Sequence, residues 1–179
     1  KQEFWYQPPR VPSAVVSNVL VILGGTDQYG LMPKILNILD EAGGDFTVTA
    51  VVGPFFHNSE VVKAAAKSAK RPVQVIPSPS TVCDYMLEAD LAVSAAGQTL
   101  YELAAVGCPT IAFAVATNQL GHLKALGESG IVLEAGDATR DGEIMTGLRV
   151  AVDALLPDVE ARATMSTIGQ RLVDGKGAQ

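Results

Sequence analysis

Hydrophobic positions along the chain follow two alternating patterns. Short runs of aliphatic and β-branched residues are separated by longer segments in which apolar residues recur every three or four positions. Short continuous runs of about four to eight apolar residues are typical of strands buried on both faces, and the longer periodic segments indicate amphipathic helices. The runs predict strands over residues 18–23, 46–52, 73–76, 91–94, 110–114 and 131–133.

The periodic segments predict helices between and after these strands. They cover about residues 31–42, 59–69, 81–89, 99–106, 119–129, 139–155 and 157–173. Strict alternation of strand and helix indicates βαβ units, which place the strands in parallel and the crossover helices against the sheet. We therefore expect an α/β fold, a Rossmann-like parallel sheet of about six strands with helices on both faces.

The first residues show neither pattern. The segment KQEFWYQPPRVPSA, residues 1–14, holds three prolines and three aromatic residues. We interpret it as an arm or interdomain linker and residues 15–179 as one domain. Together with the polar ending VDGKGAQ, this arm leads us to expect that the chain is half of a larger protein, excised as a domain.

Composition and charge narrow the classes of function. Hydrophobic residues make up 48% of the chain and the formal net charge is −6. No apolar run reaches the roughly 20 residues of a membrane span, and no signal peptide is visible. The negative charge argues against nucleic acids and anionic membranes as partners. A bound phosphate would thus be held by backbone amides rather than by a cluster of lysines.

The two cysteines, Cys83 and Cys108, form no CxxC pair and have no histidine-rich neighbourhood. We expect both to be small buried hydrophobic residues rather than a disulfide or a metal site. A reducing, cytoplasmic location is the corresponding expectation. No acidic DxD pair lies beside the loops described next, so neither a metal nor another cofactor is expected.

The loops that follow the strands carry the chemistry, because parallel α/β sheets bind ligands beyond the carboxyl ends of their strands. In LGGTDQYG, residues 23–30, two glycines allow a sharp turn and close backbone approach, and Thr26 or Asp27 can cap the next helix. The loop is neither a GxGxxG fingerprint nor a P-loop. A plain turn and a phosphate or substrate contact both remain open for this loop.

The next two loops carry weaker signals. In VGPFFHNSE, residues 52–60, Asn58 or Ser59 is a good N-cap, and a structural role for His57 is favoured over a catalytic one. In IPSPSTVCDYM, residues 76–86, Ser80 or Thr81 can cap the following helix. The two prolines there stiffen a backbone that could offer amide and carbonyl groups to a flat base, with Val82 packed on its face.

The strongest signal is SAAGQTLYELAAVGCPTIAF, residues 94–113. Small residues end a strand at Gly97, and Gln98 and Thr99 begin a helix whose free amides and positive dipole end suit a diphosphate. Glu102 lies on the same helical face as Thr99 and can accept two hydroxyl hydrogen bonds from a ribose. The alternative is a capping box in which Glu102 pairs with Thr99.

The last loop is AVATNQLGHLKAL, residues 114–126. Asn118 and Gln119 start a helix and could bind sugar hydroxyls, although Asn118 is also an ordinary N-cap residue. His122, one turn later, faces either the cleft or solvent.

These loops together resemble the C-terminal domain of GT-B nucleotide-sugar enzymes. The resemblance rests on GGTD after the first strand, GP after the second, EADLAVSAAGQTLYELAAVGCPTIAF and the later NQ, and it covers about residues 19–177, including the terminal DGKGA. The sequence looks most like the UDP-sugar hydrolase family of pseudaminic acid biosynthesis and its spore-coat-polysaccharide relatives. The peptidoglycan N-acetylglucosaminyltransferase family is a more distant cousin. The T-x-x-E element with the following G-x-P-T is the most specific part.

In such families this domain binds the nucleotide diphosphate of the donor. The resemblance implies phosphate binding by Gly97, Gln98 and Thr99, ribose binding by Glu102, uracil binding by the backbone of Ser78 and Pro79 with Val82, sugar contacts from Asn118 and Gln119, and a cleft position for Gly25 and Thr26. Relatives usually have a second glycine where Ala96 stands. The general-base histidine of the hydrolase family lies in the N-terminal domain, so neither His57 nor His122 inherits that role and the catalytic residues stay unknown.

The resemblance implies a UDP-sugar-binding half of a hydrolase or glycosyltransferase. Such an enzyme acts at the anomeric carbon in the synthesis of bacterial surface polysaccharides or nonulosonic acids. Its partners would be a UDP-sugar and the missing N-terminal domain, and the chain alone would bind without turnover. Two alternatives remain: half of a sugar-nucleotide 2-epimerase, or a non-catalytic nucleotide-binding module fused to a sugar-activating enzyme.

Overall fold

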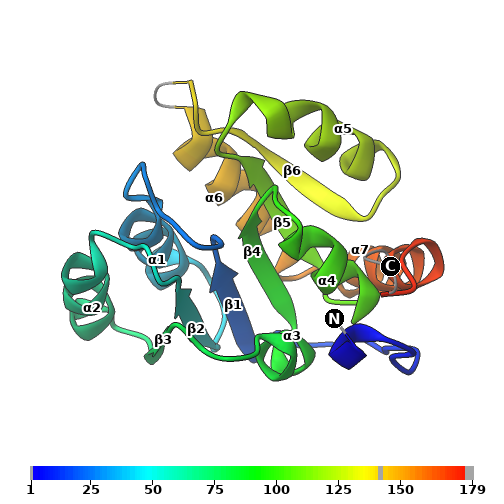
Figure 1. Cartoon of the computed structure of the whole chain (residues 1–179). Helices are drawn as coiled ribbons and strands as arrows, with labels where there is room; N and C mark the ends of the chain where they lie inside the picture. Colours follow the sequence, from blue (N-terminus) through cyan, green and yellow to red (C-terminus); the bar gives the residue numbers. More distant parts are fainter. Residues whose placement is uncertain (1, 141–142, 176–179) are drawn as a thin grey trace.

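The computed structural model describes residues 2–140 and 143–175, and these form a parallel sheet with helices on both faces (Figure 1). The six strands of the sheet lie in the order β3-β2-β1-β4-β5-β6, and every neighbouring pair is parallel. This order is that of the doubly wound Rossmann fold, so the predicted fold class is confirmed. The strands are β1 Asn18–Ile22, β2 Thr47–Val52, β3 Val73–Pro77, β4 Leu91–Ala95, β5 Thr110–Ala114 and β6 Val132–Asp137.

The helices divide between the two faces of the sheet. Those whose buried residues share one core are α1 (Leu31–Glu41), α2 (Ser59–Ser68) and α6 (Glu143–Leu155). The second core takes the buried faces of α3 (Cys83–Glu88), α4 (Thr99–Ala105) and α5 (Leu120–Glu128). The last helix, α7 (Val159–Leu172), contacts α4 and α6, and the 3₁₀ turns are η1 (Gln2–Phe4) and η2 (Thr117–Gln119).

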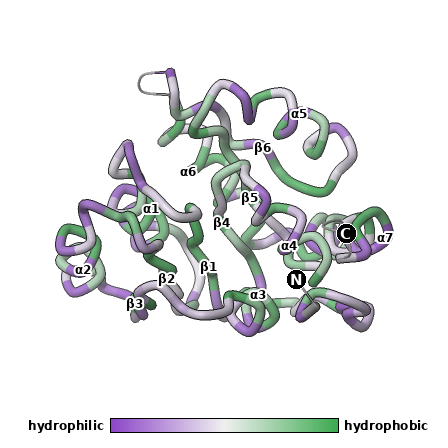
Figure 2. Tube along the Cα trace, in the orientation of Figure 1, coloured by the Kyte–Doolittle hydropathy of each residue, from purple (hydrophilic) through white to green (hydrophobic). Residues whose placement is uncertain are grey.

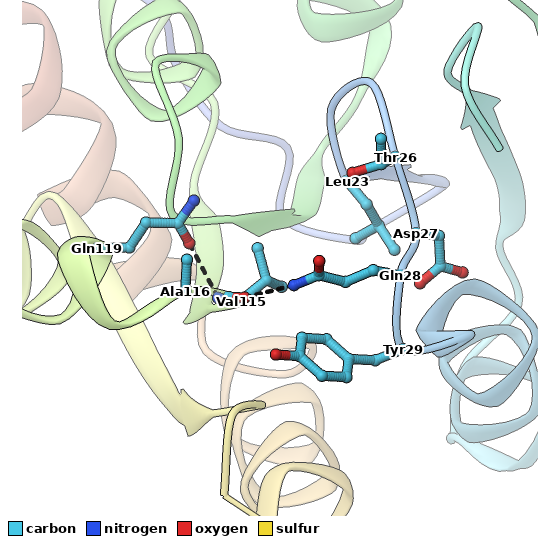
Figure 3. Close-up of a pocket in the computed structure, with 8 residues that line it drawn as sticks. All are labelled: Leu23, Thr26, Asp27, Gln28, Tyr29, Val115, Ala116 and Gln119. Atoms are coloured by element: carbon cyan, nitrogen blue, oxygen red, sulfur yellow. Dashed lines mark hydrogen bonds between the residues drawn. The ribbon is translucent and has the colours of Figure 1, made fainter.

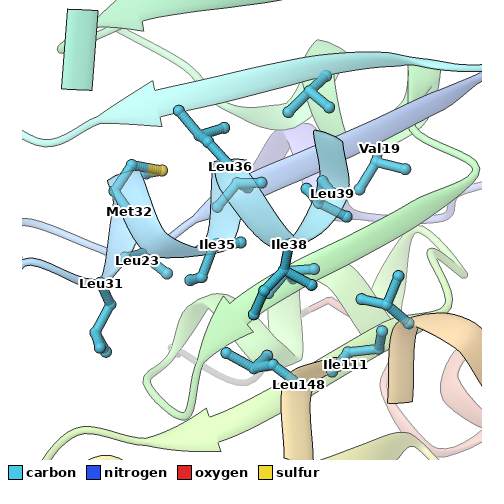
Figure 4. Packing of buried hydrophobic residues seen from close by; sticks show 14 of the residues in the cluster. Val19, Leu23, Leu31, Met32, Ile35, Leu36, Ile38, Leu39, Ile111 and Leu148 are labelled. Carbon is cyan, nitrogen blue, oxygen red and sulfur yellow. The ribbon is translucent and has the colours of Figure 1, made fainter. Parts of the chain in front are cut away.

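Helix α1 shows why the hydrophobic pattern determines these positions. Its apolar residues recur on one face, and Met32, Ile35 and Leu39 are at most 1% exposed where they pack over the sheet (Figure 4). Burying each such side chain contributes about 1.5–3 kcal/mol. Figure 2 shows the same contrast along the trace, with hydrophobic colour at the central strands and hydrophilic colour concentrated on peripheral helices and loops.

Every predicted strand and helix is present, and the differences lie at the ends. Strand β6 continues to Asp137, beyond the predicted end at residue 133, with an irregular register opposite Ala112 and Phe113 of β5. As an edge strand it tolerates exposed residues such as Glu134, which ended the apolar run in the sequence. Helix α6 begins at Glu143 instead of residue 139, because Thr139 donates its amide and hydroxyl to the Asp137 carboxylate in a turn.

The N-terminal segment has little regular structure after η1, yet it lies against the domain. Phe4 is 1% exposed within the second core. The amide of Arg10 donates to Oε1 of Gln170 on α7 at 2.8 Å. In the described part of the chain, no helix has the length and apolar character needed to cross a membrane. The predicted resemblance extends to residue 177, of which residues 176–177 lie outside the described residues.

Candidate functional site

The strand order reverses between β1 and β4. The chain leaves β1 towards α1 and β2 on one side of the sheet, whereas it leaves β4 towards α4 and β5 on the other side (Figure 1). Open α/β sheets bind their ligands at such a reversal, beyond the carboxyl ends of the strands. The loops after β1 and β4 therefore flank the candidate site, and both contain predicted site residues.

The loop after β1 is held from two sides and leaves its glycines at the surface. Asp27 accepts hydrogen bonds from the amides of Leu31, at 2.7 Å, and Met32, at 2.9 Å. Asp27, rather than Thr26, is thus the residue that caps α1. The carbonyl of Gly25 accepts from the amide of Phe55 at 3.0 Å, which ties this loop to the loop after β2.

The loop after β2 contacts the loop after β1 through a side chain as well. Asn58 is the residue preceding α2, and its side chain makes no cap bond to that helix. Its Nδ2 instead donates to Oδ2 of Asp27 at 3.1 Å, so the two loops share one polar contact. His57 is exposed on this loop.

The loop after β4 leaves open space where a ligand is predicted. A β-carbon built on Gly97 would have no heavy atom within 4 Å. The amide of Gly97 donates to the carbonyl of Ala95 at 2.8 Å, and the amide of Leu100 donates to the carbonyl of Gly97 at 3.2 Å. The amides between these two, of Gln98 and Thr99, are not used by this turn. They are the candidate donors to a ligand.

The start of α4 lies directly after the glycine turn at Gly97. Thr99 is the first residue of α4, and the residue before it, Gln98, makes no side-chain cap bond. A capping box requires the hydroxyl residue at the cap itself, three residues before the acid. Gln98 therefore occupies the cap position, and Thr99 stands one residue inside the helix. Glu102 is half-buried one turn into the helix.

A ring stack connects the first turns of α4 and α5. The rings of Tyr101 and His122 have centroids 5.0 Å apart and planes inclined by 28°. His122 is half-buried and faces Tyr101 of α4. Its Nε2 atom is buried and has no hydrogen-bond partner among the described residues.

The loop after β3 has an unusual backbone. Ser78 has φ 41°, in the left-handed region that a non-glycine residue rarely adopts. Its amide donates to the carbonyl of Val52 at 2.8 Å, so this amide is not available to a base, contrary to one part of the sequence interpretation. Pro79 and Val82 are half-buried beside it, and Thr81 Oγ1 accepts from the amide of Cys83 at 3.2 Å.

A pocket of about 220 Å³ lies between the loops after β1 and β5 (Figure 3). Gln28 and Gln119 reach Val115 from its two sides: Nε2 of Gln28 donates to its carbonyl at 2.9 Å, and its amide donates to Oε1 of Gln119 at 2.9 Å. The Nε2 group of Gln119 takes no part in this bridge. The pocket is lined by Leu23, Thr26, Asp27, Gln28, Tyr29, Val115, Ala116 and Gln119.

Two predicted residues lie in this pocket, and others do not. The structure brings Thr26 and Gln119 together there, whereas Gly25 and Asn118 are exposed and do not line it. Asn118 lies within η2 and does not cap α5, which begins at Leu120. The sequence analysis named neither Gln28 nor Val115, although both fall within loops that it singled out.

The cysteines and the acidic side chains are the candidates for a second site. Cys83 and Cys108 are buried free thiols, as predicted, and burial raises the pKa of Cys108 to about 12. Among residues 2–140 and 143–175, no group of three or more His, Cys, Asp or Glu side chains could hold a metal ion.

Comparison with known proteins agrees with this architecture. A structure of MurG from Acinetobacter baumannii superposes with a TM-score of 0.72 at 19% identity, over 86% of this chain and 45% of that chain. A structure of HepE from Anabaena, in complex with UDP-glucose, superposes with a TM-score of 0.69 at 14% identity, over 88% of this chain and 44% of that chain. At these identities the likeness concerns the fold alone.

Sequence comparison gives the family. The chain is 27% identical to the spore coat polysaccharide biosynthesis protein SpsG of Bacillus subtilis (strain 168), over 164 residues that make up 89% of this chain and 47% of SpsG. It therefore spans about half the length of that relative. The model of the family "Glycosyltransferase family 28 C-terminal domain" matches residues 19–173. Since this match spans most of the chain, the chain belongs to the glycosyltransferase family 28 C-terminal domain family.

Proposed function

We propose that this chain is the nucleotide-binding half of a two-domain enzyme and that it binds the diphosphate of a UDP-sugar. The observation that carries the proposal is the opening of the loop after β4 at the sheet reversal, with space at Gly97 and two amides outside the local turn bonds. A structural neighbour, HepE, is described in complex with UDP-glucose. Membership of a glycosyltransferase family supports the same class of ligand.

The proposed site divides the donor among three loops. The amides of Gln98 and Thr99 bind the diphosphate, where the positive end of α4 adds to the attraction. Glu102 accepts the ribose hydroxyls. The carbonyls of Ser78 and Pro79 are the groups left to bind uracil, because the Ser78 amide is already used by Val52.

The sugar is proposed to extend towards the pocket beside β5. Thr26 and Nε2 of Gln119 are among the neutral hydrogen-bonding groups of this pocket, which is lined by no cationic side chain. Neutral donors and acceptors suit hydroxyl groups better than a second phosphate. Asn118 and Gly25 would then contact the donor only from outside this pocket.

Chemistry at the anomeric carbon would release UDP, and the amides of α4 would stabilise the negative charge that develops on the leaving diphosphate. The acid or base is proposed to come from a separate N-terminal half, as the resemblance implies. The same half would decide between hydrolysis and transfer. The SpsG relative supports a role in polysaccharide biosynthesis.

Calorimetric titration with UDP, UMP, CMP and free glucose tests the proposal. We expect the chain to bind UDP more tightly than UMP, and free glucose not at all. Glu102→Ala should weaken UDP binding by about tenfold or more, the loss of a hydrogen bond to a charged group. The matched control is Glu160→Ala, which removes an exposed acid from α7.

Two results would contradict the assignment. If Glu102→Ala and Glu160→Ala bind UDP equally well, Glu102 does not contact the ribose. Failure of the wild-type chain to bind any of these nucleotides would overturn the proposed function.

A further inference from the structure

We propose that the N-terminal arm, residues 3–14, clamps α3 and thereby positions the loop 78–82 for the nucleotide base, with Arg10 as the positioning residue. The part that concerns the base rests on the function proposed above. The clamp itself rests on contacts at both ends of α3.

Helix α3 depends on tertiary contacts for its position. It has six residues, from Cys83 to Glu88, and the residue before it, Val82, provides no side-chain cap bond. Isolated helices shorter than about 12 residues are marginal in water, so a helix of this length is held by what packs against it. Cys83 and Met86 are its buried residues and face the second core.

Arg10 binds the C-terminal end of α3. Its Nη1 donates to the carbonyl of Met86 at 3.2 Å, and its Nη2 donates to the carbonyl of Ala89, the residue that ends the helix. The last carbonyls of a helix have no partner within the helix, and a guanidinium is the side chain best able to bind two of them together. Arg10 thus acts as an external C-cap.

The arm is itself bound to α7, which holds Arg10 in place. Gln170 on α7 accepts from the amide of Arg10 at 2.8 Å and donates from Nε2 to the carbonyl of Pro8 at 2.9 Å. The two bonds of one side chain hold both sides of Pro9. The guanidinium of Arg10 is therefore presented to α3 from a segment anchored on α7.

A second contact joins the arm to the first residue of α3. The thiol of Cys83 donates to the carbonyl of Glu3 at 3.4 Å, and the adjacent Phe4 is 1% exposed in the core that α3 faces. Figure 1 shows the N-terminal segment beside α3 and α7. The arm thus holds α3 at its first residue and at its end.

These contacts have a consequence for ligand binding. Val82 directly precedes α3, so a shift of the helix moves the proposed base-binding loop. Gln98 and Thr99 lie at the start of a different helix, α4, whereas the contacts of Arg10 and Glu3 described above are made to α3 and to Ala89. Loss of the clamp should therefore weaken the binding of the nucleoside. The binding of the diphosphate should stay unchanged.

The test compares Arg10→Met with Arg149→Met. Arg149 lies on α6, on the other face of the sheet, where its guanidinium contacts Glu41, so the control also removes one arginine. Amide hydrogen exchange reports on α3 in the ligand-free chain. Titration with UDP and with inorganic pyrophosphate separates the nucleoside contacts from the diphosphate contacts.

We expect Arg10→Met to speed exchange in residues 84–88 and to raise the Kd for UDP by about tenfold, equivalent to about 1.4 kcal/mol. The Kd for pyrophosphate should stay within about twofold of wild type, and Arg10→Lys should restore part of the UDP affinity. Arg149→Met should behave as wild type in every measurement.

Three outcomes would overturn the inference. Exchange in α3 that is unchanged by Arg10→Met means that Arg10 is no clamp. Faster exchange with an unchanged Kd for UDP means that the helix does not position the base. Equal weakening of UDP and pyrophosphate means a general loss of structure. If the wild-type chain does not bind UDP, the proposed function is overturned. The hydrogen-exchange data then still test whether Arg10 holds α3 in place.

Discussion

The carbonyl oxygen of Gly24 lies so close to Gly53 that a β-carbon built on Gly53 would be 2.3 Å from it. The same β-carbon would be 2.7 Å from the carbonyl carbon of Gly25. The loop after β1 thus rests on the backbone of the loop after β2, at a position where only glycine leaves room. A side chain at Gly53 would therefore displace the loop that carries Gly25 and Thr26.

The first prediction follows from that contact. Gly53→Ala should displace the loop after β1 and destabilise the chain by about 1–3 kcal/mol, as overpacking does. Urea denaturation measures the loss. Gly43→Ala is the matched control, because a β-carbon there meets no heavy atom within 4 Å. If both variants unfold at the same urea concentration as wild type, the contact does not constrain the loop.

The second prediction isolates the ribose. If Glu102 accepts its hydroxyls, replacing UDP by deoxyuridine diphosphate should weaken binding to the wild-type chain by about tenfold, the value of a hydrogen bond to a charged group. In Glu102→Ala the two nucleotides should bind almost equally. This double cycle removes any general effect of the mutation.

The contrary result of this cycle is equally clear. If wild type and Glu102→Ala lose the same affinity on removal of the hydroxyl, another group reads the ribose. Glu102 would then stabilise α4 instead of binding the ligand.

The fold was predictable because its signals are local. Five of the six strands are apolar runs that end within one residue of their observed limits, since burial on both faces requires continuous hydrophobic sequence. Only β6 was misjudged substantially, because an edge strand admits exposed residues such as Glu134. The turn at Gly97 was also predictable, because small residues at the end of a strand are typical of a turn.

The tertiary details of the site were not predictable from a single sequence. Gln119 was expected to contact sugar, yet one end of its side chain binds the amide of Val115, four residues earlier. The Asp27 carboxylate joins two loops through Asn58, which is 31 residues away. Such contacts depend on which loops the sheet brings together. The local residue pattern does not predict which loops these are.

The third prediction uses the two ends of Gln119. In Gln119→Glu an oxygen remains to accept from the Val115 amide, but the Nε2 donor is lost. Stability should change by no more than about 0.5 kcal/mol. With UDP-glucose as the probe, the affinity should fall while that for UDP is unchanged.

Gln119→Met is the companion variant, because it loses both functions. It should weaken UDP-glucose binding and also loosen the loop after β5, which amide hydrogen exchange at Val115 will detect. Equal loss of UDP and UDP-glucose affinity in Gln119→Glu would show that this residue acts on the whole site rather than on the sugar.

The fourth prediction concerns alkaline pH. Burial raises the pKa of the Cys108 thiol from 9.0 to about 12, so the folded chain keeps the thiol protonated while the unfolded chain ionises it above pH 9. The stability that this group contributes is complete below pH 9 and is lost as the pH rises towards 12. The loss approaches about 1.4 kcal/mol per pH unit within that range.

Urea denaturation between pH 8 and about pH 10.5 measures this effect by comparing wild type with Cys108→Ala. The variant should be less stable at pH 8, because a buried side chain has been truncated, but its stability should fall less steeply with pH. Parallel pH profiles would show that the thiol ionises as readily in the folded chain as in the unfolded chain.

The fifth prediction concerns Arg162 on α7, which is 0% exposed. Its Nη1 donates at 2.7 Å to the carbonyls of Leu155 and Leu156, and its Nη2 donates to those of Ser13 at 2.9 Å and Ala14 at 3.1 Å. One guanidinium thus joins the end of α6 to the segment that leads into β1. Its burial lowers its pKa, because the charged form has lost solvent.

Arg162→Met keeps most of the buried volume but leaves these four carbonyls without their donor. Because an unsatisfied buried acceptor costs about 1–3 kcal/mol, we expect a loss of at least about 3 kcal/mol in the free energy of unfolding. Arg171→Met, an exposed change on the same helix, is the control and should alter stability by less than about 0.5 kcal/mol. Both are measured by urea denaturation. Equal stability of the two variants would mean that water replaces the guanidinium at these carbonyls, and that the junction before β1 is held by apolar packing alone.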